Sequence, residues 1–308
     1  MRRAELLGVL IAAWAVASCE AIAGLGDFGP EPATPGGSGG VAGTGGGGGS
    51  AGTGGGSTGG GGGTPFDQPA ADHSRSFGSS AVDELAGLDT IGWDVFIAGT
   101  HLADIEIAVE HQNSQGTNPF VAGLGPSLDP DWSKSFDTAG TSWVGDLDAG
   151  GARVSVVGYS VETIGFGGSP LTPVAPSDAF WAQVSTTDGS HQNSAMANAS
   201  GAQHAWAVEA RGGGAIMAGL FLGTLDFGPP STPMTADNKD GFVVRYDDQG
   251  NVVWATRIGG PDQQEVRAIV TNGSESPPRL YVAGIHRDTV TIDDGGTSAC
   301  DSIPHHAM

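Results

Sequence analysis

A repeat with a spacing near 60 residues constrains the fold of this chain more than any other feature of its sequence. Four ten-residue segments align without gaps: GTHLADIEIA from Gly99, GYSVETIGFG from Gly158, GLFLGTLDFG from Gly219 and GIHRDTVTID from Gly284. The seventh and ninth positions are apolar in every copy, which predicts a strand with one buried face. Because one such unit cannot cover its own apolar face, neighbouring units must stack on one another.

Further pieces recur in each unit. A segment that opens with Asp or Asn follows about twenty residues after the glycine, as NPFVAGL at Asn118, DAFWAQV at Asp178 and DGFVVRY at Asp240. Twelve residues past its Phe, the aligned positions are Trp132, Gln192 and Trp254. SWVGDLD, HAWAVEA and EVRAIVT suggest one more strand per unit. With no convincing amphipathic helix after residue 20, the pattern predicts an all-β, β-propeller-like array of about four 60-residue repeats.

These segments resemble the bacterial β-propeller repeat family often called SBBP, whose units carry D-A-F-V-A-K-[LY], a turn with Gly, L-W-S and a fragment ending V-[YA]-V-A-G. Residues 240–246, 251–254 and 280–284 match best, whereas Gln192 stands where the family has Trp. The resemblance covers roughly residues 73–300. It implies that the Asp of each D-[AG]-F segment orients a turn and that Phe and Trp fill the space between blades. Such motifs specify packing and say little about function.

The repeat sets the expected domain boundaries. We expect a β-propeller repeat domain over 73–308, with units near 73–136, 137–196, 197–258 and 259–308. Residues 73–78 align with 132–137, so the domain is predicted to open with the last strand of a unit. A strand to precede it in the sheet is expected near 303–305, where the sequence is Ile303-Pro304-His305-His306. We therefore expect a truncated chain or an incomplete last blade.

The N-terminus has the form of an export signal. Arg2 and Arg3 precede an uncharged apolar stretch over 6–17, shorter than the roughly 20 residues that span a bilayer. Val16-Ala17-Ser18-Cys19 resembles the bacterial lipobox, which implies removal of residues 1–18 and lipidation of the Cys19 thiol. An ordinary secretory signal with an incidental Cys19 is the alternative. We predict a lipoprotein of the cell envelope, at the outer membrane, with secretion as the alternative.

Residues 19–72 are predicted to be a disordered tether. Of the 28 residues from 36 to 63, 19 are Gly, and the others are Ser, Thr, Ala and Val. Such a stretch buries no apolar surface and behaves as a flexible coil that spans roughly 30 Å. A phosphate-binding loop does not fit, because no Gly-Lys-Ser/Thr follows.

Charge and composition narrow the possible partners. The 12 Lys and Arg residues face 34 Asp and Glu residues, which gives a net charge of −22. A nucleic-acid partner is excluded, because phosphate binding needs clustered basic residues. Apart from the membrane, reached through lipid on Cys19, the predicted partner is an unknown extracellular protein or glycan.

Several residues are candidates for chemical sites by their type. Asp247, Asp248 and Asn251 could bind Ca²⁺, but a hairpin turn explains them better. Metal binding at Cys300, Asp301, His305 and His306 fits by residue type, but these residues lie in a Pro-containing tail. The tryptophans at repeat-locked positions are expected in the core rather than as sugar-stacking platforms; they are Trp132, Trp143, Trp206 and Trp254.

No catalytic, metal-binding or cofactor-binding residue is predicted. The chain has no Gly-x-Ser-x-Gly elbow, and its His residues share no repeat position. The sequence alignment also shows no polar position common to the four units on strands that would face a channel. The prediction is therefore a non-enzymatic binding module. The alternatives are a polysaccharide-active propeller enzyme, or a truncated structural envelope protein without activity.

Overall fold

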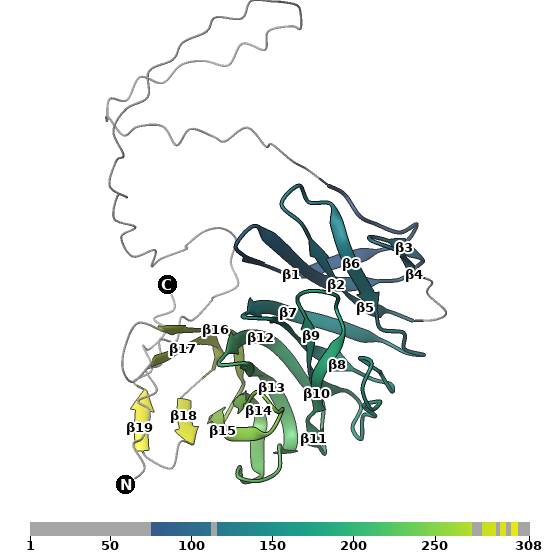
Figure 1. The fold of residues 1–308 in the computed structure, drawn as a ribbon. Helices are drawn as coiled ribbons and strands as arrows, with labels where there is room; N and C mark the ends of the chain where they lie inside the picture. The colour runs from purple at the N-terminus through teal and green to yellow at the C-terminus, as the bar shows by residue number, and fades with distance from the viewer. Residues whose placement is uncertain (1–74, 112–115, 273–278, 288–289, 294–296, 301–308) are drawn as a thin grey trace, which may run out of the picture. The chain divides into compact units, whose positions relative to one another are not determined.

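The fold is drawn in Figure 1 from a computed structural model that describes residues 75–111, 116–272, 279–287, 290–293 and 297–300. These residues form antiparallel β-sheets and contain no helix, so the all-β prediction is confirmed for them. It follows that the described residues offer no long apolar helix that could cross a membrane. The predicted signal peptide and tether lie outside them.

The first two sheets have four strands each and follow the same plan. The first has the order β1-β2-β5-β6, with β1 at Asp83–Ile91, β2 at Asp94–His101, β5 at Asn118–Leu124 and β6 at Pro130–Ser135. The second has the order β7-β8-β9-β10, with β7 at Ser142–Gly150, β8 at Arg153–Ser160, β9 at Asp178–Ser185 and β10 at His191–Met196. A small hairpin of β3 (Ile105–Glu106) and β4 (Glu110–His111) stands apart.

The third sheet repeats the plan and continues beyond it. Its core is β12 (Gln203–Arg211), β13 (Gly214–Asp226), β14 (Met234–Tyr246) and β15 (Val252–Gly259), and β11 (Asn198–Ala199) pairs with the far end of β13. The strands β18 (Val290–Asp293) and β19 (Thr297–Cys300) extend this sheet beyond β15. A fourth sheet consists of β16 (Gln264–Asn272) and β17 (Arg279–His286). We call the four repeats units 1 to 4 and β1, β7, β12 and β16 their first strands; β18 and β19 belong to unit 4 by the repeat, although they extend the third sheet.

A bulge at one repeat position explains the glycine that opens each repeated segment. In every unit the register between the first and second strands shifts by one residue. The bulged residues, all on the first strands, are Ala86, Gly145, Trp206 and Arg267. The bulge brings the carbonyl oxygen of the residue two positions before it against the glycine of the second strand. A Cβ on Gly158 would overlap the Trp143 carbonyl, and Gly99, Gly219 and Gly284 meet the equivalent oxygen in the same way. No side chain fits there.

The apolar pairs of the repeat form the contacts between units. Their side chains are buried, except that Phe227 is half-buried, so the predicted one-sided burial is confirmed. Phe166 of unit 2 packs on Phe136 at the end of unit 1, with ring centroids 4.8 Å apart and planes inclined by 57°. Ile292 is the ladder partner of Ile258 of unit 3, and both side chains belong to one buried cluster. Each apolar pair therefore covers the end of the preceding unit, and the largest buried clusters lie between sheets rather than within one.

A side chain on the fourth strand ties each unit to the next. Trp132 lies opposite Gly123, and its ring nitrogen donates to the carbonyl oxygen of Thr186 in unit 2 at 2.8 Å. In unit 2 the equivalent residue is Asn193, whose side-chain amide donates to the Asp248 carbonyl of unit 3 at 3.1 Å. The ungapped alignment that placed Gln192 here is wrong by one residue. The reason is that the turn from β9 to β10 is one residue longer than the equivalent turns of units 1 and 3, as the ladder pairs Val184–His191, Leu124–Pro130 and Tyr246–Val252 show.

The start of the domain differs from the prediction. Of the residues expected to form the last strand of a unit, 75–78 are described, and they form no strand. Their aromatic residue nevertheless takes the expected place. Phe77 packs on a cluster that contains the apolar pair of unit 1, Ile105 and Ile107, as Phe136 packs on unit 2.

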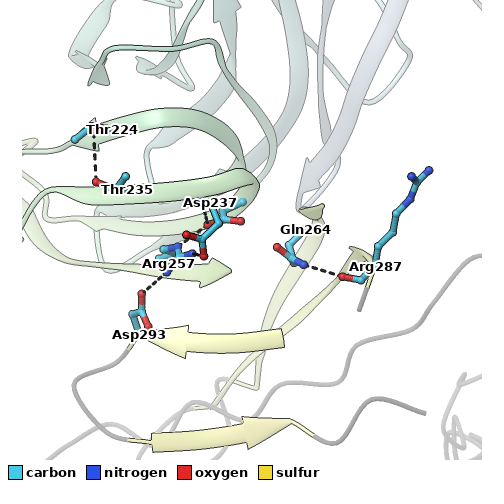
Figure 2. A network of polar contacts seen from close by, with 8 residues as sticks. Thr224, Thr235, Asp237, Arg257, Gln264, Arg287 and Asp293 are labelled. Atoms are coloured by element: carbon cyan, nitrogen blue, oxygen red, sulfur yellow. Dashed lines mark hydrogen bonds and ion pairs between the residues drawn. The ribbon is translucent and has the colours of Figure 1, made fainter. Parts of the chain in front are cut away.

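Ion pairs of Arg257 connect β18 to the other strands of the third sheet. Figure 2 shows Arg257 of β15 between Asp237 and Asp293, which its guanidinium contacts at 2.8 and 3.2 Å. The same guanidinium bonds the fully buried Asp240 at 2.5 Å. Nearby, the Gln264 amide donates to the Arg287 carbonyl at 3.0 Å. Arg257 thus links Asp240, the opening residue of the D-G-F segment within β14, to the end of β18.

Candidate functional site

Aromatic and basic side chains from three units meet at one end of the first strands. Tyr159 of β8 stacks on His204 of β12, with centroids 3.9 Å apart and planes inclined by 22°. Trp206 meets His204 edge-on at 5.4 Å. The guanidinium carbon of Arg267, on β16, lies 4.8 Å from the centre of the Trp206 ring. We call these four residues the ring cluster.

The repeat explains why these side chains gather. His204 lies two residues before the bulged residue of its strand. The other units have Glu84, Trp143 and Glu265 at this position. Trp206 and Arg267 are the bulged residues of their strands. Because first strands of neighbouring units lie side by side, a bulged side chain on one of them reaches the next. The rings are half-buried, so part of their surface faces solvent.

Charged residues surround the cluster. Lys239 bonds Glu265 at 2.9 Å, and Glu265 also pairs with Arg267. Although burial opposes it, the pairing with Lys239 and Arg267 lowers the pKa of Glu265. Burial, and then the charges of Lys239 and Arg267, lower the pKa of His204, so its imidazole is neutral at pH 7. The cluster therefore combines the apolar faces of three rings with the Arg267 guanidinium, which its ion pair with Glu265 holds in place.

A serine–histidine contact in the cluster does not form a nucleophilic centre. The Ser177 hydroxyl lies 3.1 Å from the His204 ring nitrogen Nε2. Ser177 is only 5% exposed, so a substrate has little access to its hydroxyl. Within the described ranges, no carboxylate is hydrogen-bonded to the His204 ring to orient it as a base. The Trp206 ring nitrogen has no acceptor among these residues. The arrangement suits binding better than acyl transfer.

A second group of polar side chains recurs in three of the four units. An acidic residue occupies the same position on the first strands of units 1, 2 and 3: Asp89, Asp148 and Glu209. We call these three the carboxylate row. In unit 4 the position is Val270. The acidic position is therefore shared by three units and not by the fourth.

Each member of the carboxylate row bonds to the following unit. Asp89 accepts from the Ala149 N–H at 2.9 Å, Asp148 accepts from the Ala210 N–H at 2.5 Å, and Glu209 accepts from the Thr271 hydroxyl. The first strand pairs with a strand on one side alone, so N–H groups on its other edge need partners. The row supplies those partners and joins neighbouring units.

Burial changes the acidity of these carboxyl groups. For Asp148, burial, and then hydrogen bonding and charge from Asp89 and the charge of Glu209, raise the pKa to about 7, against the opposing Ala210 N–H. Burial likewise raises the pKa of Asp146, which accepts from the Val208 N–H at 3.0 Å, to about 6. No group of three or more residues suited to a metal ion occurs in the described part of the chain.

The sequence-predicted candidates are distributed over the fold. Trp132 is buried at 8% exposure and belongs to the core, as predicted. Trp254 packs on the core between units 3 and 4, whereas Trp206 belongs to the ring cluster. Trp143 is half-buried on β7. The Asp247 carboxylate accepts from the N–H groups of residues 249 and 251, so the hairpin-turn interpretation is confirmed.

Other candidates lie where the structure gives no side-chain account. Cys19 and the tail residues Asp301, His305 and His306 fall outside the described residues. The backbone of Cys300 forms part of β19.

No protein-family model matches the chain, and no curated protein matches it. What the site binds must therefore follow from its own chemistry.

Proposed function

We propose that this protein is a lipid-anchored β-propeller of the cell surface that acts as a non-enzymatic binding module, with the ring cluster as its binding site. The observation that carries the proposal is the half-buried stack of Tyr159, His204 and Trp206 with Arg267 beside it. Aromatic rings with adjacent polar groups suit the apolar face and hydroxyl groups of a sugar ring. The proposed ligand is therefore an extracellular glycan.

The propeller architecture is supported by the repetition of contacts between units. The same bulge occurs in all four first strands, and the same apolar pair covers the preceding unit. In a propeller the first strands line the central channel, so the ring cluster would lie at one channel mouth. The membrane anchor is supported by the lipobox-like sequence that ends at Cys19.

A specific observation favours a second candidate, the polysaccharide-active enzyme. The carboxylate row places acidic groups on first strands, and the pKa of Asp148 is raised to about 7, which suits a general acid. Against this, Asp89, Asp148 and Glu209 each accept a hydrogen bond from the next unit. Their bonds identify them as links between units, so binding without catalysis remains the proposal.

One experiment separates the two candidates. The full chain is mixed with a panel of soluble neutral and uronic-acid oligosaccharides, and both saturable binding and the mass of each sugar after incubation are measured. Binding with unchanged sugar masses supports the module. Shorter or unsaturated products that disappear with Asp148→Asn would establish the enzyme instead. Binding of no sugar would contradict the glycan proposal and direct attention to a protein partner.

The anchor has its own test. The intact mass of the native protein, extracted from membranes with detergent, should equal a chain that begins at Cys19 plus acyl groups. Cys19→Ser should abolish the acyl mass and release the protein from the membrane. An unmodified mass beginning at another residue would contradict the anchor and leave a secreted protein.

A further inference from the structure

Unit 1 exposes the face that the other units bury. Leu85 and Leu88 on β1 are 57% and 60% exposed. The equivalent residues of unit 2, Val144 and Leu147, are 6% and 4% exposed, because they pack against unit 1. The equivalents in unit 3 are also buried, against unit 2. This face is therefore one half of a contact that recurs between successive units.

Unit 4 exposes the other half of the same contact. On β17, Tyr281, Ala283 and Ile285 alternate on one face, at positions where unit 3 has Ile216, Ala218 and Leu220. The unit 3 residues are buried, and two of them belong to its cluster with unit 4. In unit 4, Ile285 is 38% exposed, and Val270 on β16 is 59% exposed. Among the described residues nothing covers this surface as a following unit would.

The two faces fit each other because each continues an interface that the chain already makes. We propose that they join two copies of this protein, with the first unit of one copy seated on the fourth unit of the other. Leu85 and Leu88 of one copy would lie against Val270 and Ile285 of the next. The occupant is a second copy of this chain, and the contact is head-to-tail.

Head-to-tail pairing has consequences that symmetric pairing lacks. A contact between two different surfaces closes into a ring if the rotation between copies allows it and otherwise continues as a chain. A symmetric dimer through Leu88 alone would bury the first-unit face against itself and leave Val270 exposed. Blocking one face should thus have a different effect from blocking both. The inference is independent of the glycan proposal, because neither face includes the ring cluster.

The test uses the full chain with Cys19→Ser, so that no lipid drives association. Leu88→Lys blocks the first-unit face, and Val270→Lys blocks the fourth-unit face. Sedimentation equilibrium should give the unblocked chain a mass of two or more copies. Each single variant should weaken self-association by about tenfold or more. An equal mixture of the two variants should form pairs, since one intact interface remains between them, and nothing larger.

The controls keep the result interpretable. Val174→Lys is the matched control, because Val174 is 68% exposed on the loop before β9 and belongs to neither face. It should associate as the unblocked chain does. Circular dichroism should show that all three variants remain folded, as expected for exposed positions. An unblocked chain of one-copy mass at its highest soluble concentration would overturn the proposal, as would undiminished association of Val270→Lys.

Discussion

Gly158→Ala should destabilise the domain strongly, because the bulge of β7 leaves no room for a methyl group. An added Cβ would overlap the Trp143 carbonyl oxygen, and it would lie 2.8 Å from Cζ of Phe180. Real Cβ atoms essentially never approach other atoms closer than 3.0 Å, so strands β7 and β8 or the Phe180 ring must move. Phe180 is fully buried and cannot yield without disturbing the core.

The expected size follows from the cost of overpacking. Forcing a methylene into a packed core costs about 1–3 kcal/mol, and a clash with backbone belongs at the upper end. A loss of about 3 kcal/mol corresponds to a fall in Tm of roughly 6–12 °C for a domain of this size. The measurements are urea denaturation and thermal unfolding followed by circular dichroism.

Gly165→Ala is the matched control. A Cβ on Gly165 meets nothing within 4 Å, and its φ lies outside the positive range that favours glycine. This change should leave stability within about 1 kcal/mol of the unaltered chain, or raise it slightly by restricting the unfolded chain. Equal effects of the two substitutions would refute the account of the repeat glycine. The same comparison at Gly219 should reproduce the large loss.

Other parts of the account make predictions of the same kind. Burial raises the pKa of Asp148 from 3.8 to about 7, so the contribution of this group to the unfolding free energy is full below about pH 4 and is lost as the pH rises to about 7. Asp148→Asn should flatten the decline in stability seen by urea denaturation between about pH 4 and pH 7, and equal slopes would contradict this. Arg257→Gln leaves the buried Asp240 without its cation and should cost about 3 kcal/mol, whereas loss of the exposed Arg75–Asp129 pair should cost at most about 1 kcal/mol; similar losses would be inconsistent with a buried clamp. Trp132→Phe removes the donor to the Thr186 carbonyl and should lower the unfolding free energy by about 1 kcal/mol; an unchanged midpoint would show that this bond is not needed.

The sequence predicted the features that repeat in residue type. Gly99 and its equivalents mark the bulge, and the apolar pairs such as Ile105 and Ile107 form the contacts between units. It placed Gln192 wrongly because the turn between β9 and β10 contains one extra residue, which an ungapped alignment cannot detect. It also missed the carboxylate row, since Asp89 and Glu209 differ in type and lie at unequal spacings from Asp148.

The ring cluster could not be predicted from the repeat. Tyr159, His204, Trp206 and Arg267 occupy several different repeat positions on three strands. Their meeting depends on the contact between the first strands of neighbouring units, which leaves no signal in residue type. A search for aromatic residues on the two strands that flank each repeat glycine would have found Tyr159 and Trp206, but not His204 and Arg267.

The most direct test of the binding proposal is a fluorescence and calorimetric titration of the full chain with the oligosaccharide panel, repeated on Trp206→Ala. Trp93→Ala is the matched control, because Trp93 is 84% exposed on the turn between β1 and β2, outside the ring cluster. Loss of stacking worth about 1.4 kcal/mol should weaken binding about tenfold in Trp206→Ala, with affinity unchanged in Trp93→Ala. Equal affinity in all three proteins would contradict the assignment of the ring cluster as the binding site.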